Sequence, residues 1–178
     1  MQMTVNNGQI VLVQFPQNGM IVDMDGAGTI GKMSLTSLPI TAAIDDVGDL
    51  LQASGPGTVY YYDDGKTKQI GDAYLYYYSD GMVKQIADLY FYYYNDRKAK
   101  QIGDVYLYYY SDGMVKQIAD LYFYYYSDGK VKQIGDVYIY YYSDGKVKQI
   151  GDIYIYYYSD GSFKETMGSD SRVQLSIS

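Results

Sequence analysis

Gly135 to Ile150 reads GDVYIYYYSDGKVKQI, and this stretch decides the fold because the chain repeats it. When the sequence is aligned with itself at a shift of 16 residues, the triplet Lys-Gln-Ile recurs at constant spacing. The triplet begins at Lys68, Lys84, Lys100, Lys116, Lys132 and Lys148. Self-similarity at a short fixed period is typical of repeat arrays, in which neighbouring copies stack into a continuous core. The sequence therefore predicts a mostly β, elongated array of stacked β-hairpin or solenoid units.

Each copy contains the sequence of one hairpin. The segment VYIYYY is dense in β-forming residues, and VKQI is a second, shorter strand. Ser143 and Asp144 suit the centre of a type I turn, and Gly145 suits the left-handed residue that follows. This predicts a three-residue hairpin loop with a G1 bulge. One copy has Arg97 in place of this Gly, which adds about 1 kcal/mol of strain.

The connection between copies is Gly135-Asp136, with Ala87-Asp88 and Ala119-Asp120 in alternate copies. Ala is disfavoured at the positive φ that a primed two-residue turn requires. We therefore expect a corner with ordinary backbone angles, which favours hairpins that coil gradually over a flat meander. The alternation has two interpretations, a duplicated pair of repeats or a packing period of two repeats.

The hairpin register predicts which side chains share a face, because opposite residues lie on the same side of a sheet. The expected pairs are Tyr142 with Lys146, Tyr141 with Val147, Tyr140 with Lys148, Ile139 with Gln149 and Tyr138 with Ile150. The apolar face then carries Val137, Ile139, Tyr141, Val147 and Gln149, and the other carries Tyr138, Tyr140, Tyr142, Lys146, Lys148 and Ile150. On this second face, tyrosines of stacked copies would form ladders over lysine stems.

These ladder tyrosines are the candidate functional residues. They are Tyr74, Tyr76, Tyr78, Tyr90, Tyr92, Tyr94, Tyr106, Tyr108, Tyr110, Tyr122, Tyr124, Tyr126, Tyr138, Tyr140, Tyr142, Tyr154, Tyr156 and Tyr158. All of them are predicted to be exposed.

Composition predicts three segments, since all 27 tyrosines lie between Tyr60 and Tyr158. Residues 1–57 are expected to form an N-terminal cap, residues 58–162 the Tyr-rich repeats, and residues 163–178 a closing strand. Within the cap, a helix is predicted at about 41–53, because apolar residues recur at helical spacing there. Those residues are Ile44, Val47, Leu50 and Leu51, with Thr41 as N-cap. The end of the chain alternates polar and apolar residues from Arg172 to Ser178, which predicts an edge strand.

The composition argues against an enzyme and against cofactors. Cys and His are both absent, which removes thiol chemistry, the commonest general base and the commonest metal ligand. Asp23-Met24-Asp25-Gly26 resembles part of a calcium loop but lacks the distal Glu, so a simple turn is expected. The glycines Gly26, Gly28 and Gly31 do not follow the βαβ pattern of a phosphate loop. No catalytic, cofactor or metal residue is therefore predicted.

The charges also limit the partners. The formal net charge is -7, whereas one copy has two Asp and two Lys and sums to zero. No basic surface exists to attract phosphate backbones, so nucleic acid is not an expected partner. The sequence has no apolar run long enough to span a membrane, and its start lacks the basic residues of a signal peptide. The compartment stays open, and a mature extracellular or cell-surface form is favoured.

The size of the predicted sheet suggests self-association. About twelve strands at about 4.8 Å each would extend roughly 55 Å. A cap of under sixty residues could not cover one whole face of such a sheet. The apolar face would then be buried by coiling, by a partner copy or in a filament, which predicts a non-enzymatic, self-associating structural protein. The alternative is a polysaccharide-binding module, in which repeated tyrosine sites act together.

The segment Tyr140 to Val147 resembles the YD repeats of RHS-type bacterial proteins, where an aromatic pair, an acidic turn, a Gly and a basic-aliphatic pair recur. It is similar also to the aromatic hairpin repeats of choline-binding and clostridial toxin cell-wall-binding modules. Both resemblances cover about Tyr60 to Gly161. In most copies this chain has Ser where YD repeats have an acid, with Asp63 and Asn95 as exceptions. It has no Trp for a choline cage, so no choline site is carried over. The resemblance implies a surface-exposed bacterial hairpin array that serves as a spacer or binds polysaccharide.

Overall fold

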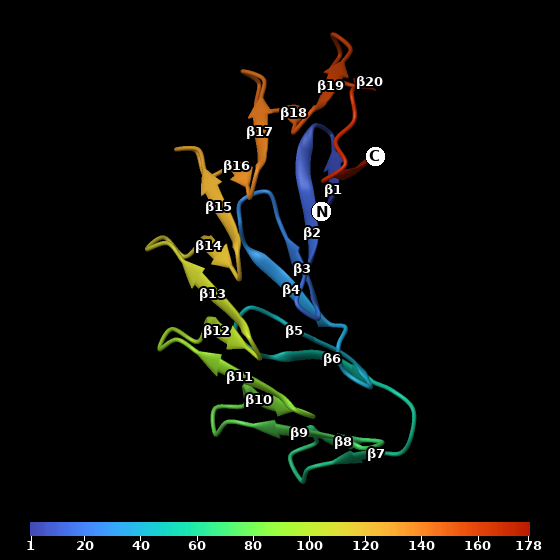
Figure 1. The fold of residues 1–178 in the computed structure, drawn as a ribbon, viewed down its shortest axis with the longest axis vertical. Helices are drawn as coiled ribbons and strands as arrows, with labels where there is room; N and C mark the ends of the chain where they lie inside the picture. Colours follow the sequence, from blue (N-terminus) through green and yellow to red (C-terminus); the bar gives the residue numbers. More distant parts are fainter. The chain divides into compact units, whose positions relative to one another are not determined.

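The computed structural model describes residues 1–178, which form twenty-one β-strands and no helix (Figure 1). The first segment contains β1 (Gln2–Asn6), β2 (Gln9–Gln17), β3 (Met20–Met24), β4 (Ile30–Leu35), β5 (Thr41–Ile44) and β6 (Leu50–Ser54), and the last strand is β21 (Gln174–Ile177). The repeats contain β7 (Val59–Tyr61), β8 (Thr67–Ile70), β9 (Ala73–Tyr77), β10 (Val83–Ile86), β11 (Leu89–Tyr93), β12 (Ala99–Ile102), β13 (Val105–Tyr109), β14 (Val115–Ile118), β15 (Leu121–Tyr125), β16 (Val131–Ile134), β17 (Val137–Tyr141), β18 (Val147–Ile150), β19 (Ile153–Tyr157) and β20 (Phe163–Met167). The mostly-β prediction is confirmed, and the chain has no helix that could cross a membrane.

The strands form two sheets in which neighbours in sequence are neighbours in space (Figure 1). One sheet has seven strands in the order β21-β1-β2-β3-β4-β5-β6. The other has fourteen strands, from β20 to β7 in reverse sequence order. Strands such as β17 and β18 pair antiparallel, whereas β21 pairs parallel with β1. The predicted succession of antiparallel hairpins is confirmed.

The chain divides into two compact units. One contains Met1–Phe15, Asp23–Thr29 and Tyr109–Ser178, and the other contains Pro16–Val22 and Ile30–Tyr108. Each unit therefore combines strands of the seven-stranded sheet with strands of the fourteen-stranded sheet. Both units bury apolar side chains from both sheets.

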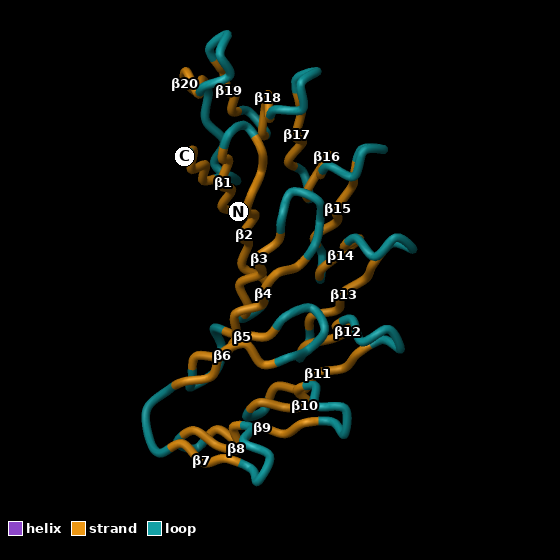
Figure 2. The backbone as a smooth tube through the Cα atoms, turned by 180° about the vertical axis from the view of Figure 1, so that it is seen from behind, coloured by secondary structure: helices purple, strands orange, loops and turns teal.

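The turn after each tyrosine run has the predicted geometry. The amide of Gly145 donates to the carbonyl of Tyr142 at 3.0 Å, and the amide of Tyr142 donates to the carbonyl of Lys146 at 2.8 Å. Gly145 has a φ of 86°, and Arg97 adopts the same left-handed conformation with a φ of 72°. These turns are the loops between β17 and β18 and between their equivalents in Figure 2. The type I turn with a G1 bulge is confirmed, including in the copy that lacks Gly.

The hairpin register was predicted correctly only next to the turn. Tyr141 pairs with Val147 as expected, but Ile139 pairs with Ile150 rather than with Gln149. The register shifts in this hairpin because β18 contains a bulge after Val147. A bulge places two residues of one strand opposite one residue of the other. As a result Val147 and Ile150 both face the core, and Ile150 was wrongly placed on the tyrosine face.

The connection between copies is a tight turn, so the predicted corner was wrong. Ile134 pairs with Val137, which leaves Gly135 and Asp136 as a two-residue loop. The φ angle is 53° at Gly135 and 47° at Ala119. A positive φ at the first loop residue is the type II′ geometry that Gly normally provides. Ala adopts this conformation in two copies at some cost in strain.

The alternation of Gly and Ala in this turn follows the size of a packed neighbour. A Cβ atom at Gly135 would lie 2.8 Å from Cδ1 of Leu121, 14 residues earlier. The equivalent neighbour of Ala119 is the smaller Val105. Ala therefore occurs only where the preceding copy has a side chain smaller than Leu, and the alternation ends at Gly151, which lies against Asp170.

We expect Gly135→Ala to lower the free energy of unfolding by about 1–2 kcal/mol, because the new methyl group meets Leu121 at a positive φ. Adding Leu121→Val should recover part of this loss, since it recreates the pair of Val105 and Ala119. Urea unfolding of the wild type, both single variants and the double variant measures the coupling. Strictly additive losses would show that the neighbour does not determine the turn residue.

The helix predicted at about 41–53 is wrong, because this range forms the hairpin of β5 and β6. The carboxylate of Asp45 accepts the amides of Val47 and Asp49 at 3.1 and 2.8 Å, which closes a turn between the strands. Gly48 has a φ of 82°, which a helix would not contain. The apolar residues at helical spacing belong to two different strands, so their periodicity did not describe one element.

Backbone carbonyls in the turns of the seven-stranded sheet accept hydrogen bonds from backbone amides at the bulges of the repeats. A bulge leaves a backbone amide outside the ladder. The amide of Val147 donates to the carbonyl of Gly8 at 2.7 Å, and that of Val131 donates to the carbonyl of Gly26 at 3.0 Å. Equivalent bonds join Val115 to Gly28, Ala99 to Asp46 and Val83 to Gly48. The first segment thus satisfies one bulge amide in each of five consecutive repeats.

The apolar face of the repeats is covered within a single chain. Val137 is 3% exposed and Ile139 is 0% exposed. The ring of Phe123 on β15 lies 5.5 Å from the ring of Phe15 on β2, in the same unit. The expectation that the first segment could not cover this face was wrong, because its strands and turns pack on it in both units. Self-association stays a prediction.

The end of the chain forms the expected edge strand, but in the seven-stranded sheet. β21 pairs with β1, and Leu175 lies opposite Met3. Before β21, the carboxylate of Asp170 accepts the amide of Asp152 at 3.2 Å, next to the last inter-repeat turn. The Arg172 guanidinium, bonded to both oxygens of Asp170, holds the pKa of that carboxyl well below its usual range. This ion pair connects the C-terminal segment to the final repeat.

Candidate ligand-binding grooves

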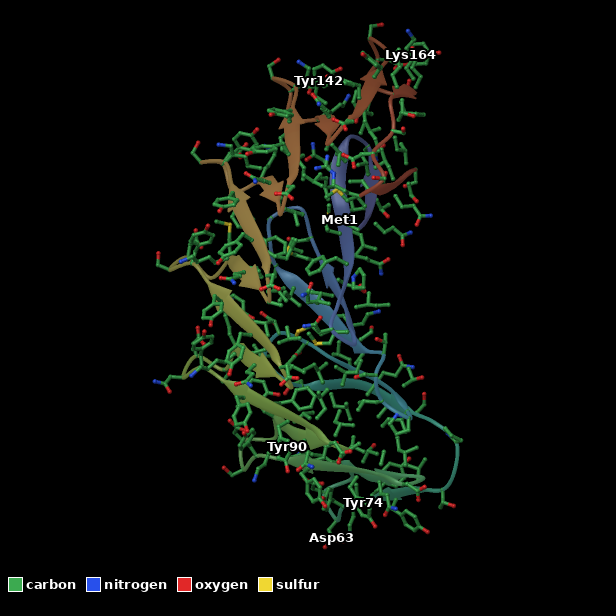
Figure 3. All side chains as sticks on the ribbon, in the orientation of Figure 1. Met1, Asp63, Tyr74, Tyr90, Tyr142 and Lys164 are labelled. Carbon is green, nitrogen blue, oxygen red and sulfur yellow. The ribbon has the colours of Figure 1, made fainter.

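The predicted ladder tyrosines occupy two kinds of environment. Twelve are exposed, namely Tyr74, Tyr76, Tyr90, Tyr92, Tyr106, Tyr108, Tyr122, Tyr124, Tyr138, Tyr140, Tyr154 and Tyr158. Six are half-buried, namely Tyr78, Tyr94, Tyr110, Tyr126, Tyr142 and Tyr156. Tyr74, Tyr90 and Tyr142 are labelled in Figure 3. The predicted uniform face is therefore divided between solvent-facing rings and rings packed between repeats.

Ten of the twelve exposed tyrosines form pairs on the same strand, and only Tyr154 and Tyr158 do not. On β17 the rings of Tyr138 and Tyr140 stack with centroids 6.4 Å apart and an interplanar angle of 17°. On β9 the rings of Tyr74 and Tyr76 stack at the same distance and an angle of 19°. These pairs present aromatic rings to solvent, on the face opposite the core.

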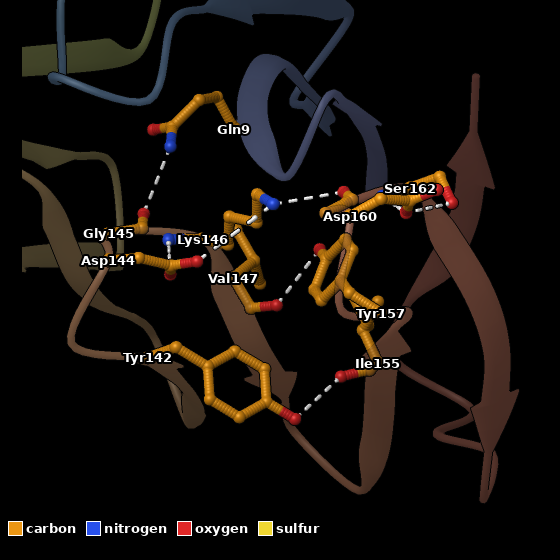
Figure 4. A network of polar contacts seen from close by, with 11 residues as sticks. Gln9, Tyr142, Asp144, Gly145, Lys146, Val147, Ile155, Tyr157, Asp160 and Ser162 are labelled. Carbon is orange, nitrogen blue, oxygen red and sulfur yellow. Dashed lines mark hydrogen bonds and ion pairs between the residues drawn. The ribbon is translucent and has the colours of Figure 1, made fainter.

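Five of the six half-buried ladder tyrosines, all except Tyr156, join one repeat to the next through their hydroxyls. The hydroxyl of Tyr142 donates to the carbonyl of Ile155 at 3.1 Å, and the hydroxyl of Tyr157 donates to the carbonyl of Val147 at 3.0 Å (Figure 4). The two rings meet edge to face, with centroids 6.1 Å apart and an interplanar angle of 80°. We refer to this reciprocal pair of bonds as the tyrosine staple. Tyr157 and its equivalents were missed as site residues, because the predicted register placed them on the apolar face.

Burial raises the pKa of Tyr157 and of four equivalent tyrosines. Desolvation, with a smaller contribution from Tyr142, raises the pKa of Tyr157 to about 12. Desolvation also raises the pKa of Tyr93, Tyr125 and Tyr141. Tyrosine is already uncharged at neutral pH, and the raised pKa keeps these hydroxyls as donors, and their rings as neutral walls between repeats, to higher pH.

Lysine ammonium groups cover the faces of the staple rings. Nζ of Lys148 lies 5.8 Å from the ring centroid of Tyr142, and Nζ of Lys146 lies 5.2 Å from that of Tyr157. Lys146 also donates to the carbonyl of Gly161 at 2.9 Å. Such cation–π contacts contribute about 0.5–1 kcal/mol at exposed sites. They hold the lysine side chains in fixed positions beside the tyrosines.

A groove lies between successive hairpin turns and repeats with the sequence. One groove of about 440 Å³ is lined by Tyr78, Ser79, Asp80, Met82, Tyr92, Tyr93, Tyr94, Lys100 and Gln101. An equivalent groove of about 420 Å³ is lined by Tyr110, Ser111, Asp112, Met114, Tyr124, Tyr125, Tyr126, Lys132 and Gln133. A third, of about 760 Å³, is lined by Tyr62, Asp63, Asp64, Lys66, Tyr76, Tyr77, Tyr78, Ser79, Lys84 and Gln85. These volumes lie within the range of small-molecule sites.

The glutamine of the Lys-Gln-Ile triplet lines these grooves and was not singled out from the sequence. Its amide is fixed, since Nε2 of Gln101 donates to the carbonyl of Gly103 at 2.8 Å and Nε2 of Gln133 donates to that of Gly135 at 2.7 Å. The amide oxygen stays available to a ligand. The signal that could have identified it is its presence in all six copies, which a solvated surface position would not require.

The charges in the grooves are balanced. The groove lined by Tyr92 contains Asp80 and Lys100, one charge of each sign. The groove lined by Tyr124 contains Asp112 and Lys132. The third groove contains two of each sign. The walls therefore combine flat aromatic rings with hydrogen-bonding groups and no net charge.

A further cavity of about 480 Å³ does not belong to this series. Its polar groups already bind one another, since the Asp25 carboxylate accepts the amides of Ala27 and Thr29 at 2.9 Å and Lys130 pairs with Asp128. Asp25 thus closes its own turn. No group of three or more acidic side chains is arranged to hold a metal ion.

The resemblances to YD repeats and to cell-wall-binding repeats stay predictions. Comparison with protein-family models and with curated proteins finds no match for this chain.

Proposed function

We propose that this chain is a non-enzymatic repeat protein that binds a neutral polysaccharide in the grooves between its hairpin turns. The observation that carries the proposal is the recurrence of an equivalent groove at three repeats, two of which have the same residue types in the same places. A single small-molecule site would need only one such groove. Recurring equivalent sites suit a polymer whose own units recur.

The groove chemistry matches that of a sugar. A pyranose ring has apolar C–H faces and a rim of hydroxyl groups, and tyrosine offers a flat apolar ring with a polar tip. In the groove of about 440 Å³, the exposed ring of Tyr92 can stack on a sugar face. Asp80, Lys100 and Gln101 can exchange hydrogen bonds with hydroxyls. The balanced charges favour a neutral polymer over an anionic one.

The spacing favours binding along a chain. Each repeat contributes two strands, so adjacent grooves recur about 9.6 Å apart along the sheet. Shallow, open grooves bind one sugar unit weakly, but linked sites convert later contacts into intramolecular ones. The expected affinity therefore rises steeply with polymer length, and monosaccharides bind poorly.

A matched pair of variants tests this function. Tyr92 and Tyr124 line grooves, whereas Tyr90 and Tyr122 lie on the same strands with similar exposure and line none of the three grooves. We expect the wild type to be retained by insoluble or gel-embedded neutral polysaccharides. Tyr92→Ser with Tyr124→Ser should weaken retention at least about tenfold, because two linked sites are lost.

Tyr90→Ser with Tyr122→Ser is the control and should bind like the wild type. Affinity gel electrophoresis against neutral glucans, mannans and xylans, with an anionic polysaccharide in parallel, gives the measurement. The proposal fails if the wild type is retained by no neutral polymer, if it prefers the anionic polymer, or if both double variants lose retention equally.

A further inference from the structure

The two ends of the fourteen-stranded sheet expose positions that the interior repeats bury. β7 and β20 are the edge strands. Val59 on β7 is 37% exposed, whereas its repeat counterpart Leu75 is 0% exposed. Phe163 on β20 is 44% exposed, whereas its counterpart Val147 is 0% exposed. Both ends therefore expose an apolar side chain at a position that the interior repeats bury.

Each end also carries half of a tyrosine staple. Tyr158 is the repeat counterpart of Tyr142, and Tyr61 is the counterpart of Tyr157. They are 56% and 62% exposed, and neither hydroxyl has a hydrogen-bond partner, in contrast to Tyr142 and Tyr157. Tyr158 has no following repeat to which it could donate, and Tyr61 has no preceding one.

The unpaired groups at the two ends are complementary. In the interior staple, the acceptors are the carbonyls of Ile155 and Val147. Their counterparts at the ends are the carbonyls of Val59 on β7 and Phe163 on β20. The end that bears Tyr158 thus lacks the acceptor that β7 offers, and the end that bears Tyr61 lacks the acceptor that β20 offers.

We propose that copies of this chain associate end to end, with β20 of one copy beside β7 of the next. The contact has the strand pairing found between two successive repeats inside the sheet, but without the two-residue turn that connects them. Interior junctions pair Gln149 with Tyr154 and Ile150 with Ile153. The same register between copies places Glu165 opposite Thr58 and Thr166 opposite Gly57. The hydroxyl of Tyr158 then donates to Val59 of the next copy, and Tyr61 of that copy donates to Phe163.

The charged residues of β20 do not oppose this pairing. Lys and Glu on an edge strand commonly discourage edge-to-edge contacts. Here Lys164 and Glu165 pair with each other at 3.3 Å, and their interior counterparts Lys148 and Gln149 coexist with a neighbouring strand. Because the two ends differ, the contact is head to tail, and it grows into open chains unless the rotation between copies closes a ring. This interface is independent of polysaccharide binding.

A proline at the outer edge of β20 gives a sharp test. Inside the sheet, Ile150 stands directly before a two-residue turn and pairs with Ile153 on the next strand, so its backbone amide faces that strand. Thr166 is the counterpart of Ile150 on β20, and its amide therefore points outward from the sheet edge. Thr166→Pro removes that donor but leaves the pairing within the chain, and proline is tolerated on such edges. Thr166→Val keeps the amide and is the matched control.

We expect sedimentation velocity of the wild type to show mass rising with concentration in multiples of 20.2 kDa. Thr166→Val should behave like the wild type, and Thr166→Pro should stay monomeric with an unchanged circular dichroism spectrum. Tyr61→Phe with Tyr158→Phe, which removes both hydroxyls without touching the backbone, should weaken association about tenfold. A wild type that is monomeric at every concentration, or a folded Thr166→Pro variant that assembles equally well, would overturn the proposal.

Discussion

Phe123→Ala is expected to lower the free energy of unfolding by about 3–5 kcal/mol. Phe123 is 0% exposed, and its ring lies 5.5 Å from that of Phe15 at an interplanar angle of 47°. It connects the repeat strand β15 to β2 of the seven-stranded sheet, so the cavity created by the substitution lies between the two sheets of one unit. The surrounding backbone is fixed by bulge amides bonded to the turns of the first segment, which limits collapse around the cavity.

Urea unfolding followed by circular dichroism measures this loss. Tyr124→Ala, at the next residue of the same strand but 44% exposed, is the matched control and should cost less than about 1 kcal/mol. Phe123→Leu should fall between the two, because it keeps most of the buried volume. A loss below about 1 kcal/mol for Phe123→Ala would mean that the first segment does not cover the repeats tightly.

The parts of the fold that the sequence predicts are those with a local chemical cause. Ser143, Asp144 and Gly145 favour one turn through their own backbone preferences, and that turn is present. The strand identity of VYIYYY likewise follows from residue type alone. Since each copy repeats these signals, the period of the array was predictable without any knowledge of contacts.

The wrong predictions concern features that depend on distant partners. The bulge after Val147 has no residue signature in β18, and it is satisfied by the carbonyl of Gly8, far away in sequence. Without the bulge, the predicted register placed Ile150 outside the core. At the inter-repeat turn Ala119 has a positive φ, and the room for its methyl group depends in the same way on the preceding copy, which has Val105 where Leu121 faces Gly135. Local propensity excluded that conformation, whereas packing between copies permits it.

The grooves could be predicted only in part. Exposure of tyrosines such as Tyr92 follows from strand alternation, which the sequence contains. The half-burial of Tyr94 and the wall formed by Tyr93 follow from the bulge, which aligns each tyrosine hydroxyl with a carbonyl of the adjacent copy. The groove therefore arises from contacts between two repeats, and no single copy specifies it.

The staple tyrosines predict a marked loss of stability in alkali. Burial raises the pKa of Tyr77 and Tyr157 to about 12, and it raises the pKa of Tyr93, Tyr125 and Tyr141 as well. In the unfolded chain, tyrosine has a pKa of about 10. Between these values the folded state binds more protons than the unfolded state, so the free energy of unfolding falls as pH rises. The stabilisation is fully present below about pH 10 and is lost progressively through about pH 12.

The expected loss is on the order of 1 kcal/mol for each staple tyrosine, after allowance for the partial exposure of these rings, and about 5 kcal/mol for the five together. That amount approaches the whole stability of many domains. Urea unfolding at a series of pH values, with tyrosinate absorbance recorded in parallel, measures it. Unfolding and the late tyrosinate signal should coincide, because a staple hydroxyl ionises readily only once its ring leaves the repeat junction.

Tyr141→Phe separates this effect from general alkaline damage. It removes one titrating group and one bond, that of the Tyr141 hydroxyl to the carbonyl of Val131 at 3.0 Å. We expect it to lower stability at neutral pH by about 1 kcal/mol and to reduce the dependence of stability on alkaline pH. Tyr138→Phe, at an exposed ring on the same strand, should change neither quantity. If the free energy of unfolding stayed constant up to about pH 12, the staple hydroxyls would not be buried donors, and the junctions between repeats would be held by side-chain packing alone.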